Sequence, residues 1–199
     1  MSDTVTESPV PGRRDPAGRR RAILTAATEI VVEQGPAALT HRAIATRAGV
    51  SLGSTTQYFA SIDELRETAL QQLADEIDTS LTQLEPLLAG FAQNPAPAIS
   101  EIHDFLRDPR AVHADVALMS TGTTDPRMRA LAQRWTDRVI DMLAVHIGRE
   151  RATAIAVYLD GATIHAALHD APLDRDHLER IILALCAMPD PAEPATPHV

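Results

Sequence analysis

Residues 40–59 read THRAIATRAGVSLGSTTQYF, and this stretch decides the fold of the amino-terminal part of the chain. The Thr40 hydroxyl can cap a short helix, which ends at Gly49 because glycine adopts a left-handed backbone at little cost. Val50 then turns an apolar side chain back towards the core, and Ser51 caps a second short helix. Two short helices joined by a tight glycine turn predict a helix-turn-helix.

The second short helix has little charge on its outer positions, which are Ser51, Leu52, Ser54, Thr55 and Gln57. Hydroxyls and amides can meet base edges and phosphates in a major groove, whereas acidic side chains would be repelled there. The pattern therefore favours a DNA-binding helix. The simpler interpretation is an ordinary pair of helices inside an all-α domain.

The stretch from Arg19 to Leu65 resembles the tetracycline-repressor (TetR) family of transcription regulators. Two positions depart from the family pattern. Thr56 stands where many members have a tyrosine that binds phosphate, and Ile62 stands where a lysine usually opens the fourth helix. The most specific matches are Ile44-Ala45, Ala48-Gly49-Val50-Ser51, Gly53-Ser54, Tyr58-Phe59, Ser61 and Asp63-Glu64-Leu65.

The resemblance implies an all-α chain of about nine helices, with a three-helix DNA-binding domain followed by a helical ligand-binding and dimerisation domain. We expect a disordered arm at 1–17, the helix-turn-helix domain at 18–62, the ligand-binding domain at 63–188 and a disordered tail at 189–199. The expected partner is double-stranded DNA. The candidate DNA contacts are Arg19, Arg20, Arg21, Thr40, Arg42, Arg47, Ser51, Leu52, Gly53, Ser54, Thr55, Gln57 and Tyr58.

The charge distribution agrees with this division. The whole chain has a formal net charge of −9, but residues 13–66 hold eight arginines and five acidic residues, a net +3, so the rest carries −12. A basic amino-terminal module on an acidic body is expected when one end meets DNA. Aromatic residues make up only 3% of the chain, which favours closely packed helices rich in Ala and Leu over a sheet.

The remaining chain predicts a series of helices. Ser61 caps a long helix that should break or kink at Pro86, and residues 120–124 should form a loop. Other helices are expected at 18–34, 98–106, 108–119, 126–148, 149–170 and 174–188.

The last two of these helices look apolar on more than one side, which predicts burial against a second copy. The family dimerises through these helices, so the resemblance implies a homodimer as well. The candidate interface residues are Ile155, Leu159, Ala162, Ala166, Leu178, Ile181, Ile182 and Leu185.

The helices that follow the helix-turn-helix also offer candidate contacts for a small hydrophobic effector, although the simpler interpretation of each apolar position among them is a core residue. Trp135, Tyr158 and His165 each bring a polar atom that could orient such a ligand. The full set of candidate ligand contacts is Leu84, Leu88, Phe91, Ile102, His103, Phe105, Met119, Trp135, Met142, Tyr158 and His165.

Chemistry of an enzyme is not indicated. His165 and His169 lie four residues apart on a helix, but Asp160 and Asp170 do not complete a known zinc pattern, so we expect no metal and no cofactor. Cys186 is the only cysteine, which excludes an intrachain disulfide. No run of residues is apolar enough to predict a membrane span or a signal core, so we expect a cytoplasmic protein without a membrane partner.

Two hypotheses stay open. The first is a ligand-responsive regulator, a repressor by family prevalence, that binds a palindromic operator as a homodimer. The second is a helical dimer that binds or converts a small molecule and does not act on DNA. The basic module and the uncharged second helix favour the first.

Overall fold

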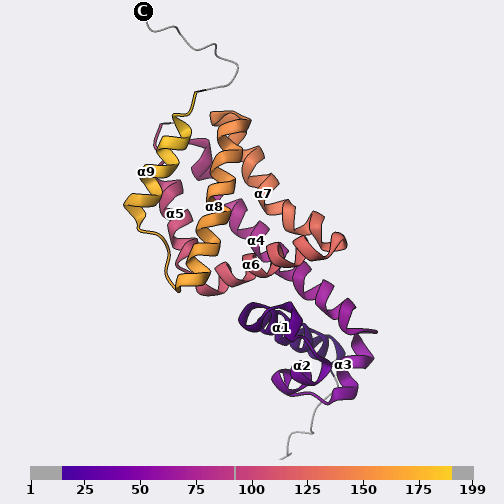
Figure 1. The fold of residues 1–199 in the computed structure, drawn as a ribbon. Helices are drawn as coiled ribbons and strands as arrows, with labels where there is room; N and C mark the ends of the chain where they lie inside the picture. The colour runs from indigo at the N-terminus through magenta and orange to yellow at the C-terminus, as the bar shows by residue number, and fades with distance from the viewer. Residues whose placement is uncertain (1–14, 92, 190–199) are drawn as a thin grey trace, which may run out of the picture.

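Nine α-helices and one short 3-10 helix form the secondary structure of the residues that the computed structural model describes, 15–91 and 93–189 (Figure 1). The all-α prediction is confirmed. Most of the predicted arm, 1–14, and of the predicted tail, 190–199, lies outside the described residues.

Helices α1 (Pro16–Gln34), α2 (His41–Ala48) and α3 (Leu52–Tyr58) form the amino-terminal module, with the 3-10 helix η1 (Pro36–Ala38) between α1 and α2. Helix α1 begins two residues before the predicted start. The reason is local, because the Asp15 carboxylate accepts the Gly18 N–H at 2.9 Å and Pro16 occupies the first helical turn.

The helix-turn-helix has the predicted caps. Thr40 Oγ1 accepts the Ala43 N–H at 3.1 Å, and Ser51 Oγ accepts the Ser54 N–H at 3.3 Å. Gly49 has φ 64° and ψ 32°, a left-handed conformation that costs other residues free energy. The turn therefore has the geometry that its sequence predicts.

Helix α4 (Ile62–Ala89) is the long element that connects the amino-terminal module to the rest of the chain (Figure 1). It begins at the predicted cap, where Ser61 Oγ accepts the Glu64 N–H at 3.0 Å. The predicted break at Pro86 is wrong, since the helix continues to Ala89. Proline costs a helix about 3 kcal/mol, and burial of Leu84 and Leu88, at about 1.5–3 kcal/mol each, offsets this cost.

The body consists of α5 (Ala96–Leu106), α6 (Pro109–Thr124), α7 (Pro126–Ile147), α8 (Arg149–His169) and α9 (Arg175–Cys186). The predicted loop at 120–124 is instead the last part of α6. Hydroxyl side chains there donate to the helix's own carbonyl oxygens, for example Thr121 Oγ1 to the Ala117 oxygen at 2.7 Å. Gly122 also lies so close to α7 that a Cβ would be 2.5 Å from the Ala132 Cβ. This packing keeps the segment helical.

Two apolar cores are joined by α4. The amino-terminal core contains Ile23, Ile44 and Phe59 and also takes in Leu70 of α4. The body core starts further along the same helix, at Leu81. Helix α6 contributes to the amino-terminal core as well, because it packs against both α1 and α4. No helix in the described ranges is both long and apolar enough to cross a membrane.

Candidate functional site

The outward face of α3 presents Leu52, Gly53, Thr56 and Gln57, all of them exposed. Two predicted DNA contacts on α3 face the other way: Ser54 is only 9% exposed, and Thr55 is fully buried. Helical geometry explains the difference, because residues 54 and 55 lie on the side of α3 that packs against α2.

Thr55 holds α3 in place. Its Oγ1 donates to the Leu52 carbonyl oxygen at 2.8 Å and lies 3.0 Å from Nδ1 of His41 in α2. Thr55 is therefore a positioning residue for α3, and Tyr58, which is half-buried, closes the same helix.

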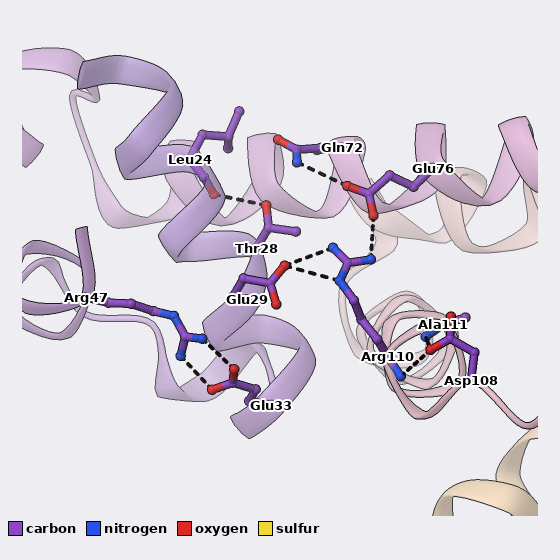
Figure 2. Close-up of polar contacts among 10 residues, drawn as sticks. All are labelled: Leu24, Thr28, Glu29, Glu33, Arg47, Gln72, Glu76, Asp108, Arg110 and Ala111. Atoms are coloured by element: carbon purple, nitrogen blue, oxygen red, sulfur yellow. Dashed lines mark hydrogen bonds and ion pairs between the residues drawn. The ribbon is translucent and has the colours of Figure 1, made fainter. Parts of the chain in front are cut away.

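Three of the arginines that are candidate DNA contacts have partners inside the module. Arg47 donates two hydrogen bonds to the Glu33 carboxylate, one of them from Nη1 to Oε2 at 2.6 Å (Figure 2). This bonding raises the pKa of Arg47 and lowers that of Glu33. The guanidinium carbon of Arg20 lies 4.9 Å from the centroid of the Phe59 ring. Arg21 Nη2 lies 3.9 Å from Asp15 Oδ2.

Arg19 and Arg42 are exposed and form no ion pair with another described residue. Arg42 lies on α2 and Arg19 on α1, so both belong to the module that contains α3. Their guanidinium groups are therefore available to phosphates. Thr40 and Ser51 already use their hydroxyl oxygens as helix caps.

Arg110 of α6 connects three helices (Figure 2). Its Nη2 donates to Glu29 Oε1 of α1 at 2.9 Å, and its Nη1 donates to Glu76 Oε2 of α4 at 2.8 Å. Gln72 donates to the other oxygen of Glu76 at 3.1 Å and so orients that carboxylate. The hydrogen bonds to Glu76 and then Glu29 raise the pKa of Arg110. The body and the amino-terminal module are thus joined by an ionic bridge, which we call the Arg110 bridge.

An apolar pocket of about 70 Å³ lies between α4, α5, α7, α8 and α9. Helix α4 supplies Ile77, Ser80, Leu81, Leu84 and Leu88 to its wall. The Trp135 ring of α7 stacks on Phe105 of α5 with 6.4 Å between the ring centroids, and both rings line the pocket. Trp135 also packs against both apolar cores.

Comparison with known proteins shows which family this chain resembles. Residues 23–80 match the family model for bacterial regulatory proteins of the tetR family. The chain is similar to the HTH-type transcriptional regulator BetI of Escherichia coli O157:H7, with 28% identity over 168 residues that cover 79% of this chain and 86% of BetI. Residues 23–80 therefore form a TetR-type amino-terminal domain, and the chain as a whole is similar to TetR-family regulators.

Solved structures of TetR-family proteins and their relatives agree with the fold. A TetR-family member from Streptomyces coelicolor A3 superposes with a TM-score of 0.68 at 28% identity, covering 84% of this chain and 97% of that one. The multidrug binding protein EbrR in complex with malachite green gives a TM-score of 0.71 at 28% identity, also with 84% of this chain and 97% of that one covered. TetR-family proteins are transcriptional regulators and not enzymes.

The pocket contains six of the eleven predicted ligand contacts, namely Leu84, Leu88, Phe91, Ile102, Phe105 and Trp135. The other five, His103, Met119, Met142, Tyr158 and His165, do not line it. His103 follows Ile102 directly, and adjacent helical residues point about 100° apart. The His165 ring instead packs on His169, with 4.1 Å between the ring centroids.

Most of the predicted dimer residues lie inside the chain. Six of the eight are buried by the chain's own helices: Ile155, Leu159, Ala162, Ala166, Leu178 and Ile182. They are core residues because one side of α8 and of α9 packs into the apolar core of the body. Three of them, Ile155, Leu159 and Ile182, line the pocket. Exposed apolar side chains lie elsewhere on α8 and α9, at Val157, Ile164, Leu168 and Leu183.

A buried carboxyl group in α6 was not predicted. Asp115 is 3% exposed, and its Oδ2 forms no hydrogen bond with any described residue. Burial, followed by the nearby Asp160 of α8, raises the pKa of Asp115 to about 7. Burial also raises the pKa of Asp160, against a hydrogen bond with Thr136 that lowers it. An acidic residue within the otherwise apolar run Ala114–Met119 is the signal that sequence reading could have used.

Proposed function

We propose that this TetR-family regulator is a cytoplasmic repressor that binds an inverted-repeat operator as a homodimer and leaves it when a small hydrophobic effector binds. One observation carries the proposal. Helix α4 packs its first half into the core of the DNA-binding module and lines the apolar pocket with its second half. A change in the pocket therefore has a rigid element through which to reach the DNA-binding helices.

The size of the pocket supports a displacement of α4. Sites for small molecules usually have volumes of about 300–1,000 Å³. The pocket has about 70 Å³, so an effector must push its walls apart to enter. Five wall residues belong to α4, including Leu84 and Leu88. The same displacement moves the DNA-binding module that α4 enters.

DNA binding is sensitive to such a movement. Two recognition helices of a dimer occupy successive major grooves only when they are about 34–36 Å apart. An effector that binds the displaced state a hundredfold more tightly contributes about 2.7 kcal/mol of coupling. This is enough to weaken operator binding by about two orders of magnitude.

The chemistry of the pocket sets the class of effector. Its wall is formed by aliphatic and aromatic side chains, with Ser80, Glu101 and Thr163 as the polar exceptions. The similar protein EbrR has been solved with proflavin and with ethidium. By analogy, we propose a hydrophobic, ring-containing effector that stacks on Trp135.

The proposed dimer uses the exposed side of α8. Val157, Gly161, Ile164 and Leu168 are spaced by three or four residues and form one exposed apolar stripe, with Leu183 of α9 also exposed. A second copy related by a two-fold axis would cover this stripe with the same residues.

Light scattering at micromolar concentration tests the dimer. Ile164→Arg places a charge in the stripe and should produce a monomer of unchanged helix content. Val145→Arg is the matched control, because Val145 is 82% exposed but lies on α7. A monomeric wild-type protein, or an Ile164→Arg variant that remains dimeric, would contradict the proposed interface.

Selection from a random duplex library, followed by Trp135 fluorescence, tests the regulator. The selected sites should contain an inverted repeat, and affinity should fall by about tenfold or more over a few-fold rise in salt. Hydrophobic compounds that change Trp135 fluorescence saturably should release the DNA. If such compounds bind and never change DNA affinity, the release mechanism is wrong.

A further inference from the structure

Leu52 is an exposed leucine on the DNA-binding module. Its side chain is 51% exposed, and it is the first residue of α3. The other large apolar side chains exposed among the described residues all lie on α7, α8 and α9. Beside it, Gly53 faces open space, since a Cβ there would meet no atom within 4 Å. The exposed apolar surface of the carboxyl-terminal helices therefore does not include Leu52.

The polar groups of α3 are largely occupied by the helix itself. Ser51 caps the helix, Thr55 is buried, and Thr56 Oγ1 donates to the Gly53 carbonyl oxygen at 3.2 Å. Gln57 is exposed, and its amide makes no hydrogen bond with another described residue. The face that can meet base edges thus consists mainly of one leucine and one glutamine.

The composition of α3 also limits what it can recognise. Guanine is usually read through O6 and N7 by an arginine or a lysine, and residues 51–60 contain neither. The apolar group on the major-groove edge of the base pairs is the 5-methyl group of thymine. Leu52 is apolar like this methyl group, and it lies at the start of α3 on the outward face of that helix.

We propose that Leu52 is a specificity-determining residue that packs against the 5-methyl group of a thymine in each operator half-site. The inference rests on the proposed operator binding and goes beyond it by naming the base that α3 prefers. Burial of the methyl group against Leu52 removes apolar surface of both partners from water. Cytosine and uracil at the same position lack this contact.

Replacement of thymine by uracil tests the proposal, because it removes only the methyl group. Duplexes selected by the wild-type dimer are remade with uracil at one thymine at a time, and affinity is measured at fixed salt. One thymine in each half-site should be sensitive, with about a fourfold loss per methyl group and about a fifteenfold loss when both half-sites are changed. This corresponds to about 0.8 kcal/mol per buried methyl group.

Variants of the protein assign the effect to Leu52. In Leu52→Ala, the thymine and uracil duplexes should bind equally at the sensitive position, whereas Leu52→Met should retain the preference. Gln57→Ala is the control, since it alters the neighbouring contact and should keep the sensitivity to uracil. Circular dichroism should show unchanged folding in all three, because both side chains are exposed.

The outcomes separate this proposal from the proposed function. If the protein selects a DNA site but no thymine is sensitive to uracil, the role of Leu52 is wrong and operator binding stands. The same holds if Leu52→Ala keeps the full sensitivity. If no duplex is selected at all, operator binding fails and the role of Leu52 fails with it.

Discussion

Asp115→Asn should change how the stability of the protein depends on pH. In the folded chain, burial raises the pKa of Asp115 from 3.8 to about 7. In the unfolded chain the carboxyl group is hydrated and has its ordinary pKa near 3.8. Between pH 3.8 and about pH 7, the Asp115 carboxyl group is ionised in the unfolded state and protonated in the folded state. The free energy of unfolding therefore falls as the pH rises from about 4 to about 7, and the contribution is constant above that range.

The size of the effect follows from the shift. One pKa unit corresponds to 1.36 kcal/mol, and the shift of about three units gives a loss of about 4 kcal/mol between pH 4 and pH 8. Asparagine keeps the shape of the side chain and cannot ionise. We expect the two proteins to be similarly stable near pH 4 and the variant to be more stable by up to about 4 kcal/mol at pH 8.

Urea denaturation at fixed protein concentration, followed by circular dichroism at several pH values, measures this difference. Asp137→Asn is the matched control, because Asp137 is an exposed aspartate on α7. The free energy of unfolding of this control should change with pH in the same way as that of the wild type. If the curves for Asp115→Asn and the wild type were also parallel, Asp115 would not keep its proton in the folded chain and the argument would be refuted.

Three further predictions concern the junctions and caps. Arg110→Ala removes both ion pairs of the Arg110 bridge and should lower the free energy of unfolding by about 1–2 kcal/mol at low salt and by much less in 1 M salt. Arg107→Ala, at a nearby exposed position, is the control and should change the free energy of unfolding little. An effect of Arg110→Ala that did not depend on salt would count against an ionic bridge. Gly122→Ala brings a Cβ to 2.5 Å from Ala132 and should cost about 1–3 kcal/mol in thermal unfolding, and Ala132→Gly in the same chain should recover part of the loss. Thr40→Ala removes the cap of α2 and should cost about 1 kcal/mol, while Thr46→Ala on the exposed side of the same helix should not; equal losses would show that the cap is not the cause.

Local signals in the sequence were sufficient for the helix-turn-helix. Thr40, Gly49 and Ser51 each act on backbone groups within a few residues, so their effect can be read without the rest of the fold. The break at Pro86 and the loop at 120–124 were wrong for the opposite reason. There the packing of Leu88 and of Gly122 on distant helices outweighs the local preference.

The sites were less accessible to sequence reading. An apolar residue in a helix can face its own core, a ligand or a partner, and spacing alone does not choose among them. Ile155 and Leu159 were assigned to a dimer interface for this reason, and they lie inside the chain. Glu29 and Arg110 are 81 residues apart, and no local pattern relates an acid in one helix to a base so far along the chain.

The amino-terminal core has a consequence for how this chain can be divided. Ala114, Ala117 and Leu118 belong to that core, although they come from α6, far beyond the helix-turn-helix in sequence. A fragment that ended after α4 would leave the surface beneath them open to water. We expect the DNA-binding module to be less stable when it is cut off after α4, so a functional chimera should carry α6, or a replacement for its buried face, along with α1 to α4.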